Sequence, residues 1–122
     1  MDLSQIKPIE KKYNLQNPAT GKETGMILTL ACSHDARVKK AHREANDKVL
    51  EAGKSLTEDQ EQEFEVSISA SYITGVEFTG DAQWKGATPK YSESLAREVC
   101  SIPALREQIL FEVRKTKDFY KA

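Results

Sequence analysis

Residues 84–120, which decide the fold, read WKGATPKYSESLAREVCSIPALREQILFEVRKTKDFY. The stretch opens on Trp84, the only tryptophan of the chain. Ser92 can cap a short helix, because its hydroxyl can accept a hydrogen bond from the first turn. The inward positions of this helix are Leu95, Ala96, Val99 and Cys100. Pro103 suits the first turn of a second helix, where its missing N–H costs nothing. We expect these two helices to hold Trp84 between them and the rest of the chain to pack on them.

The second helix is expected to run to the aromatic pair Phe119-Tyr120. One face of it carries Ile102, Leu105, Ile109, Val113 and Phe119. Phe111 falls on the opposite side, with Leu110 between the two faces. A helix with a single apolar face would leave Phe111 in water. An exposed aromatic residue of this kind indicates contact with a partner or a second copy, or a helix covered on both sides.

Five apolar side chains are candidates for partner binding. The aromatic tail is either a frayed end held on the core or a docking site, and aromatic residues at helical spacing, such as Phe64 and Tyr72, are typical of a core. The predicted partner-binding residues are Trp84, Leu110, Phe111, Phe119 and Tyr120.

The composition limits the class of protein. A chain of 122 residues is expected to form one domain, residues 1–122, with a modest core. Apolar residues make up 39% and aromatic residues 7%, so the core is thin or part of the chain orders on a partner. The net charge of −1 argues against nucleic acid as a partner, since phosphate neutralisation dominates such binding. No apolar run reaches the ~20 residues of a membrane span.

The N-terminal sequence lacks the apolar segment of a signal peptide, and we expect a cytoplasmic protein in which Cys32 and Cys100 stay reduced. Residues 1–12 show no stable period and are expected to form a loose arm. Residues 13–30 predict a β-hairpin, because two apolar segments flank Asn17-Pro18-Ala19-Thr20-Gly21-Lys22, which has the composition of a turn.

Residues 35–122 are expected to be mainly helical. Ser33 or Asp35 can cap a helix that runs to about Ala52 and ends at Gly53, before the break at Lys54-Ser55. Its apolar stripe is Val38, Ala41, Ala45, Val49 and Ala52. Because three of these five are alanines, the stripe is shallow and the helix is expected to be peripheral. The predicted fold is therefore α+β, with a small N-terminal β-hairpin packed on a bundle of about four helices.

Residues 64–74 have two competing periodicities. Phe64, Val66 and Ile68 alternate with polar residues, which favours a strand, whereas Phe64, Ile68, Tyr72 and Val76 form a helical stripe. Thr57-Glu58-Asp59-Gln60 has the sequence of a capping box, which favours a helix. We predict a central helix that ends at Gly75. Residues 76–84 are then expected to form a second small hairpin or a structured loop.

No pattern in the sequence predicts a catalytic, cofactor or metal site, and we expect a protein that is not an enzyme. Cys32, His34, Asp35 and His42 match no strong zinc spacing and are interpreted as a buried thiol with solvated neighbours. A nucleophilic Cys100 would need a histidine beside it, and both histidines lie far away in the sequence. The glycines never form a phosphate-binding pattern.

The order of these features resembles that of the tail assembly chaperones of long-tailed bacteriophages. The matching segments are residues 15–21 (LQNPATG), 25–30 (GMILTL), 35–38 (DARV), 73–78 (ITGVEF), 91–93 (YSE), 102–109 (IPALREQI) and 118–120 (DFY). Together they extend over nearly the whole chain, from about residue 13 to residue 120, and it is their order that carries the resemblance.

The resemblance implies a function without catalysis. Members of this family coat the long, partly hydrophobic tape measure protein, keep it in solution and help to gather tail tube subunits around it. It also implies self-association, a place in the host bacterial cytoplasm and absence from the mature virion. The alternatives are a structural virion component, such as a tail completion or connector protein, and a nucleic-acid-binding regulator that uses the helix at 35–52.

Overall fold

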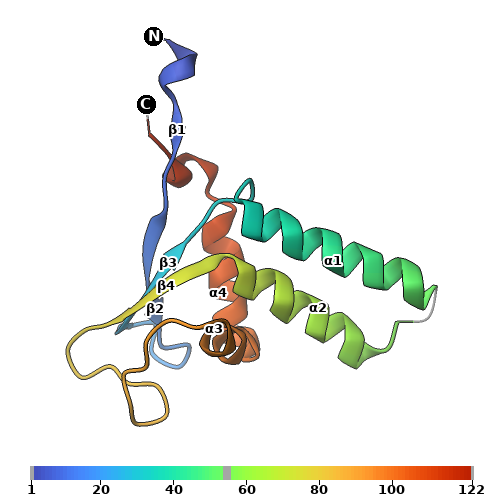
Figure 1. The fold of residues 1–122 in the computed structure, drawn as a ribbon. Coiled ribbons are helices and arrows are strands. Elements are labelled where there is room, and N and C mark those ends of the chain that lie inside the picture. Colours follow the sequence, from blue (N-terminus) through green and yellow to red (C-terminus); the bar gives the residue numbers. More distant parts are fainter. Residues whose placement is uncertain (1, 54–55, 122) are drawn as a thin grey trace.

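The computed structural model describes residues 2–53 and 56–121 (Figure 1). Lys54 and Ser55, part of the predicted break after the first helix, lie outside the described residues, as do Met1 and Ala122. The elements in chain order are η1 (Leu3–Gln5), β1 (Lys7–Pro8), β2 (Lys11–Gln16), β3 (Glu23–Leu30), α1 (Ala36–Ala52), α2 (Glu58–Ser71), β4 (Ile73–Phe78), α3 (Glu93–Cys100), α4 (Pro103–Val113), η2 (Thr116–Phe119) and β5 (Tyr120–Lys121). The predicted α+β class is confirmed: the described residues form a hairpin of β2 and β3 with four α-helices.

The main sheet is antiparallel with strand order β2-β3-β4. Its central strand alternates, with Met26, Leu28 and Leu30 buried and the residues between them partly exposed. This alternation directs one face of the sheet to the helices and the other to solvent. The buried face joins residues of α2, α3 and α4 in one hydrophobic core, which includes Val66, Leu95, Val99, Cys100, Leu105 and Ile109.

Strand β4 corrects the predicted extent of the central helix. Residues 64–71 are helical, as expected, and the capping box of Thr57 and Gln60 is present. However, α2 ends at Ser71, and Ile73–Phe78 pairs with β3 instead of continuing the helix to Gly75. The physical reason is that a two-stranded hairpin is marginal alone, whereas a third strand pairs the open edge of β3 and buries Ile73. Gly75 lies directly opposite Thr29, where an added Cβ would come within 3.1 Å of the threonine hydroxyl.

The last helix is also shorter than predicted. α4 ends at Val113, and Phe119 belongs to the separate 3-10 turn η2. Phe119 is still buried, because η2 folds back onto the core. Lys11 holds this turn by an ion pair of 2.7 Å with Asp118.

The N-terminal arm projects from the body beside the C-terminus (Figure 1). Residues 1–12 were expected to form a loose arm, but Lys7 and Pro8 pair with Lys121 and Tyr120, and β2 already begins at Lys11. This pairing explains why the arm has a defined conformation, because β5, far away in the sequence, supplies backbone hydrogen bonds that the arm cannot make locally.

Residues 76–84 were expected to form a second small hairpin or a structured loop. The hairpin is not formed, because residues 73–78 pair with β3, and residues 79–84 form a loop. Instead, Trp84 and Ala87 form an isolated bridge around Lys85 and Gly86. Both turn residues have positive φ, +52° and +78°, as a tight hairpin turn requires.

Candidate partner-binding surface

Helices α1 and α2 lie side by side and project together from the sheet (Figure 1). Asp35 caps the start of α1, as predicted, and Gly53 caps its end. It packs mainly on α2, and its buried residues are Val38 and Ala45. Near the tip of the pair, Leu50 is 80% exposed. The prediction that this helix is peripheral is confirmed, and one side of its alanine stripe remains open.

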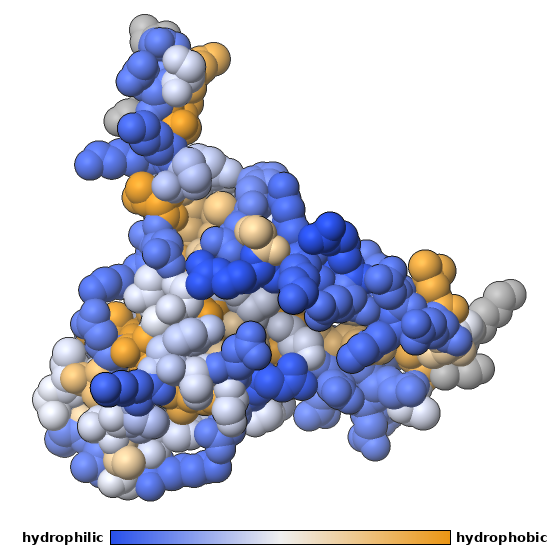
Figure 2. All heavy atoms as spheres, in the orientation of Figure 1, coloured by the Kyte–Doolittle hydropathy of each residue, from blue (hydrophilic) through white to orange (hydrophobic). Residues whose placement is uncertain are grey.

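An open groove of about 350 Å³ runs between α1, α2 and the start of α3. Its buried and half-buried lining residues, which form the floor, are Ala41, Ala45, Phe64, Ser67, Ala70, Ser71 and Ala96. Four of these are alanines, so the groove exists because methyl groups stand where larger side chains would close the space. Hydrophobic atoms are visible between the hydrophilic surfaces of the two helices in Figure 2.

The rim of the groove is charged. The exposed lining residues on α1 are Arg37, Lys40, Glu44 and Lys48, and those on α2 and α3 are Glu63, Glu93 and Arg97. The α1 wall is therefore mainly basic, and the opposite wall carries two carboxylates and one guanidinium.

Most of the rim charges have partners within the chain. Arg37 Nε lies 3.1 Å from Asp35 Oδ1, and its hydrogen bond lowers the pKa of that carboxyl group. Lys40 pairs with Glu44, and Arg97 pairs with Glu63, each at 3.9 Å. Lys48 and Glu93 form no ion pair with any described residue. These two charges remain available to a molecule in the groove.

The residues predicted to bind a partner lie elsewhere. Phe119 is 1% exposed and is a core residue, while Trp84, Leu110 and Tyr120 are half-buried against the core. Phe111 is 62% exposed, as expected for a helix with one apolar face. Lys115 Nζ covers its ring at 4.8 Å from the centroid. None of these five residues lines the groove.

Sequence reasoning missed the groove although its parts were visible. The shallow alanine stripe of residues 35–52 and the stripe containing Phe64 were each recognised. Their juxtaposition depends on how α1 crosses α2 and α3, which no local pattern specifies.

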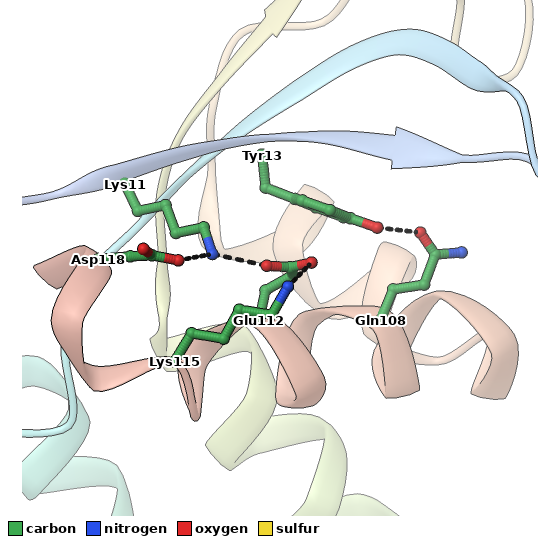
Figure 3. A network of polar contacts seen from close by, with 6 residues as sticks. All are labelled: Lys11, Tyr13, Gln108, Glu112, Lys115 and Asp118. Atoms are coloured by element: carbon green, nitrogen blue, oxygen red, sulfur yellow. Dashed lines mark hydrogen bonds and ion pairs between the residues drawn. The ribbon is translucent and has the colours of Figure 1, made fainter.

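A polar network ties the two ends of the chain together beneath the sheet (Figure 3). Lys11 Nζ lies 2.6 Å from Glu112 Oε2, and Lys115 lies 3.1 Å from the other oxygen of the same carboxylate. Beside them, the side chain of Gln108 accepts hydrogen bonds from Tyr13 Oη at 3.0 Å and from the Gln16 amide at 2.9 Å. Because all these groups are satisfied within the chain, the network has a structural role.

The residues considered as catalytic groups or metal ligands include both cysteines and both histidines. Cys32 and Cys100 are buried free thiols, and burial raises the pKa of Cys100 to about 12. His34 and His42 are exposed. Among residues 2–53 and 56–121, no three His, Cys, Asp or Glu side chains are close enough together to hold a metal ion.

Comparison with known proteins gave no match to any family model, curated protein or solved structure. Within the described segments, no helix has the length and apolar content needed to cross a membrane.

Proposed function

We propose that this protein is a phage tail assembly chaperone that binds helical segments of the tape measure protein and keeps them in solution. It acts by binding alone, without catalysis or a cofactor. In this proposal it works in the bacterial cytoplasm, self-associates along its client, helps to recruit tail tube subunits and leaves before the virion is complete.

The observation that supports this proposal best is the open groove between α1 and α2. An unpartnered groove between two antiparallel helices fits a third helix, which would complete a three-helix arrangement. The charged rim keeps the free protein soluble, while the alanine floor offers apolar contact to a client. The second support is the resemblance carried by the seven segments from residue 15 to residue 120.

The test is co-expression with a fragment of the tape measure protein that is insoluble alone. We expect the wild-type chain to move the fragment into the soluble fraction. Ala41→Trp, which places an indole in the groove, should lose this effect. Asn46→Trp is the matched control, because Asn46 is exposed on α1 and lies outside the groove. If wild type leaves the fragment insoluble, the proposal is wrong. Detection of the chain in purified virions would favour a structural tail component instead.

A further inference from the structure

We infer that the groove holds an amphipathic helix with a stripe of large apolar side chains, oriented with its N-terminus at the Glu93 end and its C-terminus at the Lys48 end. This inference rests on the proposed function and specifies the class of segment that the same surface recognises.

The size of the partner's side chains follows from the floor of the groove. Ala41, Ala45 and Ala70 each present only a methyl group to a space of about 350 Å³. Well-packed helices alternate large and small residues across their contact, so that the layers interdigitate without voids. Small side chains on the partner would leave this space empty. Leucine-sized side chains would fill it, with Phe64 on the floor and the exposed Tyr91 just before α3 as the large contacts that the chain supplies.

The length of the partner follows from α1. The residues of α1 that line the groove run from Arg37 to Lys48, about 17 Å along the helix axis, so the groove can contact about three turns of a bound helix. A helix of that length is marginal in water alone and orders on a surface that buries its apolar stripe.

The direction of the partner follows from the two rim charges that have no ion pair within the described chain. Lys48 lies in the last part of α1, near the tip of the helix pair, whereas Glu93 begins α3, which lies at the end of the pair next to the sheet (Figure 1). A helix carries partial positive charge at its N-terminus and partial negative charge at its C-terminus. The carboxylate of Glu93 therefore attracts an N-terminus, and the ammonium group of Lys48 attracts a C-terminus. The bound helix then runs parallel to α1 and antiparallel to α2.

The experiment uses the full chain and a designed 16-residue peptide with capped ends, a leucine stripe, and glutamate and lysine distributed evenly over its polar face. A nitroxide is attached to one peptide end at a time, and broadening of the amide signals of the protein is measured by NMR. We expect the label at the C-terminus to broaden Val49 and Leu50, and the label at the N-terminus to broaden Ala96 and Arg97. Equal broadening by both labels, or the opposite assignment, would overturn the inferred direction.

Variants test the physical cause. The pair Lys48→Glu and Glu93→Lys should remove or reverse the preference, and each single change should weaken binding about two- to five-fold. Lys39→Glu with Glu107→Lys is the matched control, because both residues are exposed and outside the groove. A peptide with an alanine stripe should bind more weakly than the leucine peptide.

The outcome separates this inference from the proposed function. If the chain solubilises the tape measure fragment but the leucine peptide leaves the groove signals unchanged, the inference is wrong and the function stands. If the groove signals instead broaden with protein concentration alone, a second copy occupies the groove, and the inference is equally wrong.

Discussion

Lys11 Nζ lies 2.6 Å from Glu112 Oε2, and this contact joins positions 101 residues apart. Both side chains are largely buried, with exposed fractions of 15% and 11%. Lys11 also pairs with Asp118 at 2.7 Å, so one ammonium group fixes α4 and the C-terminal turn to the edge of the sheet.

We predict that Lys11→Met destabilises the protein by about 1–3 kcal/mol, because Glu112 would keep only Lys115 as a partner in a site with little water. The free energy of unfolding in urea measures this loss. Lys12→Met is the matched control, since Lys12 and its partner Glu77 are 62% and 54% exposed. An exposed pair contributes about 0–1 kcal/mol, and equal losses in both variants would contradict the structural role of Lys11.

The same network predicts a dependence of stability on acid pH. Burial raises the pKa of Glu112, but the hydrogen bonds from Lys11 and Lys115 outweigh burial, and the pKa lies below its usual value of 4.5. A carboxyl group whose pKa is lower in the folded state contributes stability above its unfolded pKa and loses it as the pH falls through the folded pKa. The stability difference between wild type and Lys11→Met should therefore shrink between about pH 5 and pH 3. Urea unfolding at several pH values measures it, and a constant difference would count against the assignment.

Cys100 provides a probe of the core. Its side chain is fully buried, and burial raises the pKa of its thiol to about 12, so almost no thiolate exists at pH 8. We expect iodoacetamide to modify Cys100 only when the protein unfolds, as measured by mass spectrometry of the digested chain. If modification requires unfolding, the destabilised variant Lys11→Met should react faster. Rapid modification of Cys100 in the native protein, at the same rate in Lys11→Met, would show that α3 is not packed as described.

Phe111 tests the predicted role of the exposed side of α4. Since Phe111 is 62% exposed, Phe111→Asp should change the free energy of unfolding by less than about 1 kcal/mol. It should weaken self-association, which is measured by static light scattering at several protein concentrations. Ile109→Asp is the contrast, because Ile109 is fully buried and an unpaired carboxylate there should unfold the chain. If Phe111→Asp also unfolds the chain, Phe111 belongs to the core.

The helical part of the fold could be predicted because its signals are local. Asp35 caps α1, Thr57 and Gln60 form their capping box, and Pro103 begins α4, all within one turn of the helices that they start. The inward residues of α3 were also predictable, since a short amphipathic helix has a single face that can be buried.

The misjudged elements depend on partners far away in the sequence. Ile73–Phe78 forms a strand because β3 offers an open edge, and Lys7–Pro8 is ordered because β5 returns to it. The groove has the same origin, since three helices must be placed before it exists. For the candidate site, the sequence indicated the exposure of Phe111 but left open whether the aromatic tail is held on the core or docks a partner, and Phe119 is buried in the core.

Gly25 offers the sharpest test of the strand arrangement. Its φ is +91°, and an added Cβ would lie 2.6 Å from the carbonyl oxygen of Thr79. That contact is tight because Thr79 donates a backbone hydrogen bond of 2.9 Å to the Gly25 carbonyl. Gly25→Ala therefore combines backbone strain with a clash against main-chain atoms, and we expect a loss of about 2–5 kcal/mol in thermal or urea unfolding.

Gly21→Ala is the control for Gly25→Ala, because Gly21 also has a positive φ, +74°, but an added Cβ would meet no atom within 4 Å. Its loss should be about 1–2 kcal/mol, from backbone strain alone. The difference between the two variants isolates the close approach of the loop after β4 to the start of β3. If both lose the same stability, residues 25 and 79 do not approach each other in this way, and the third strand would have to end earlier than Phe78.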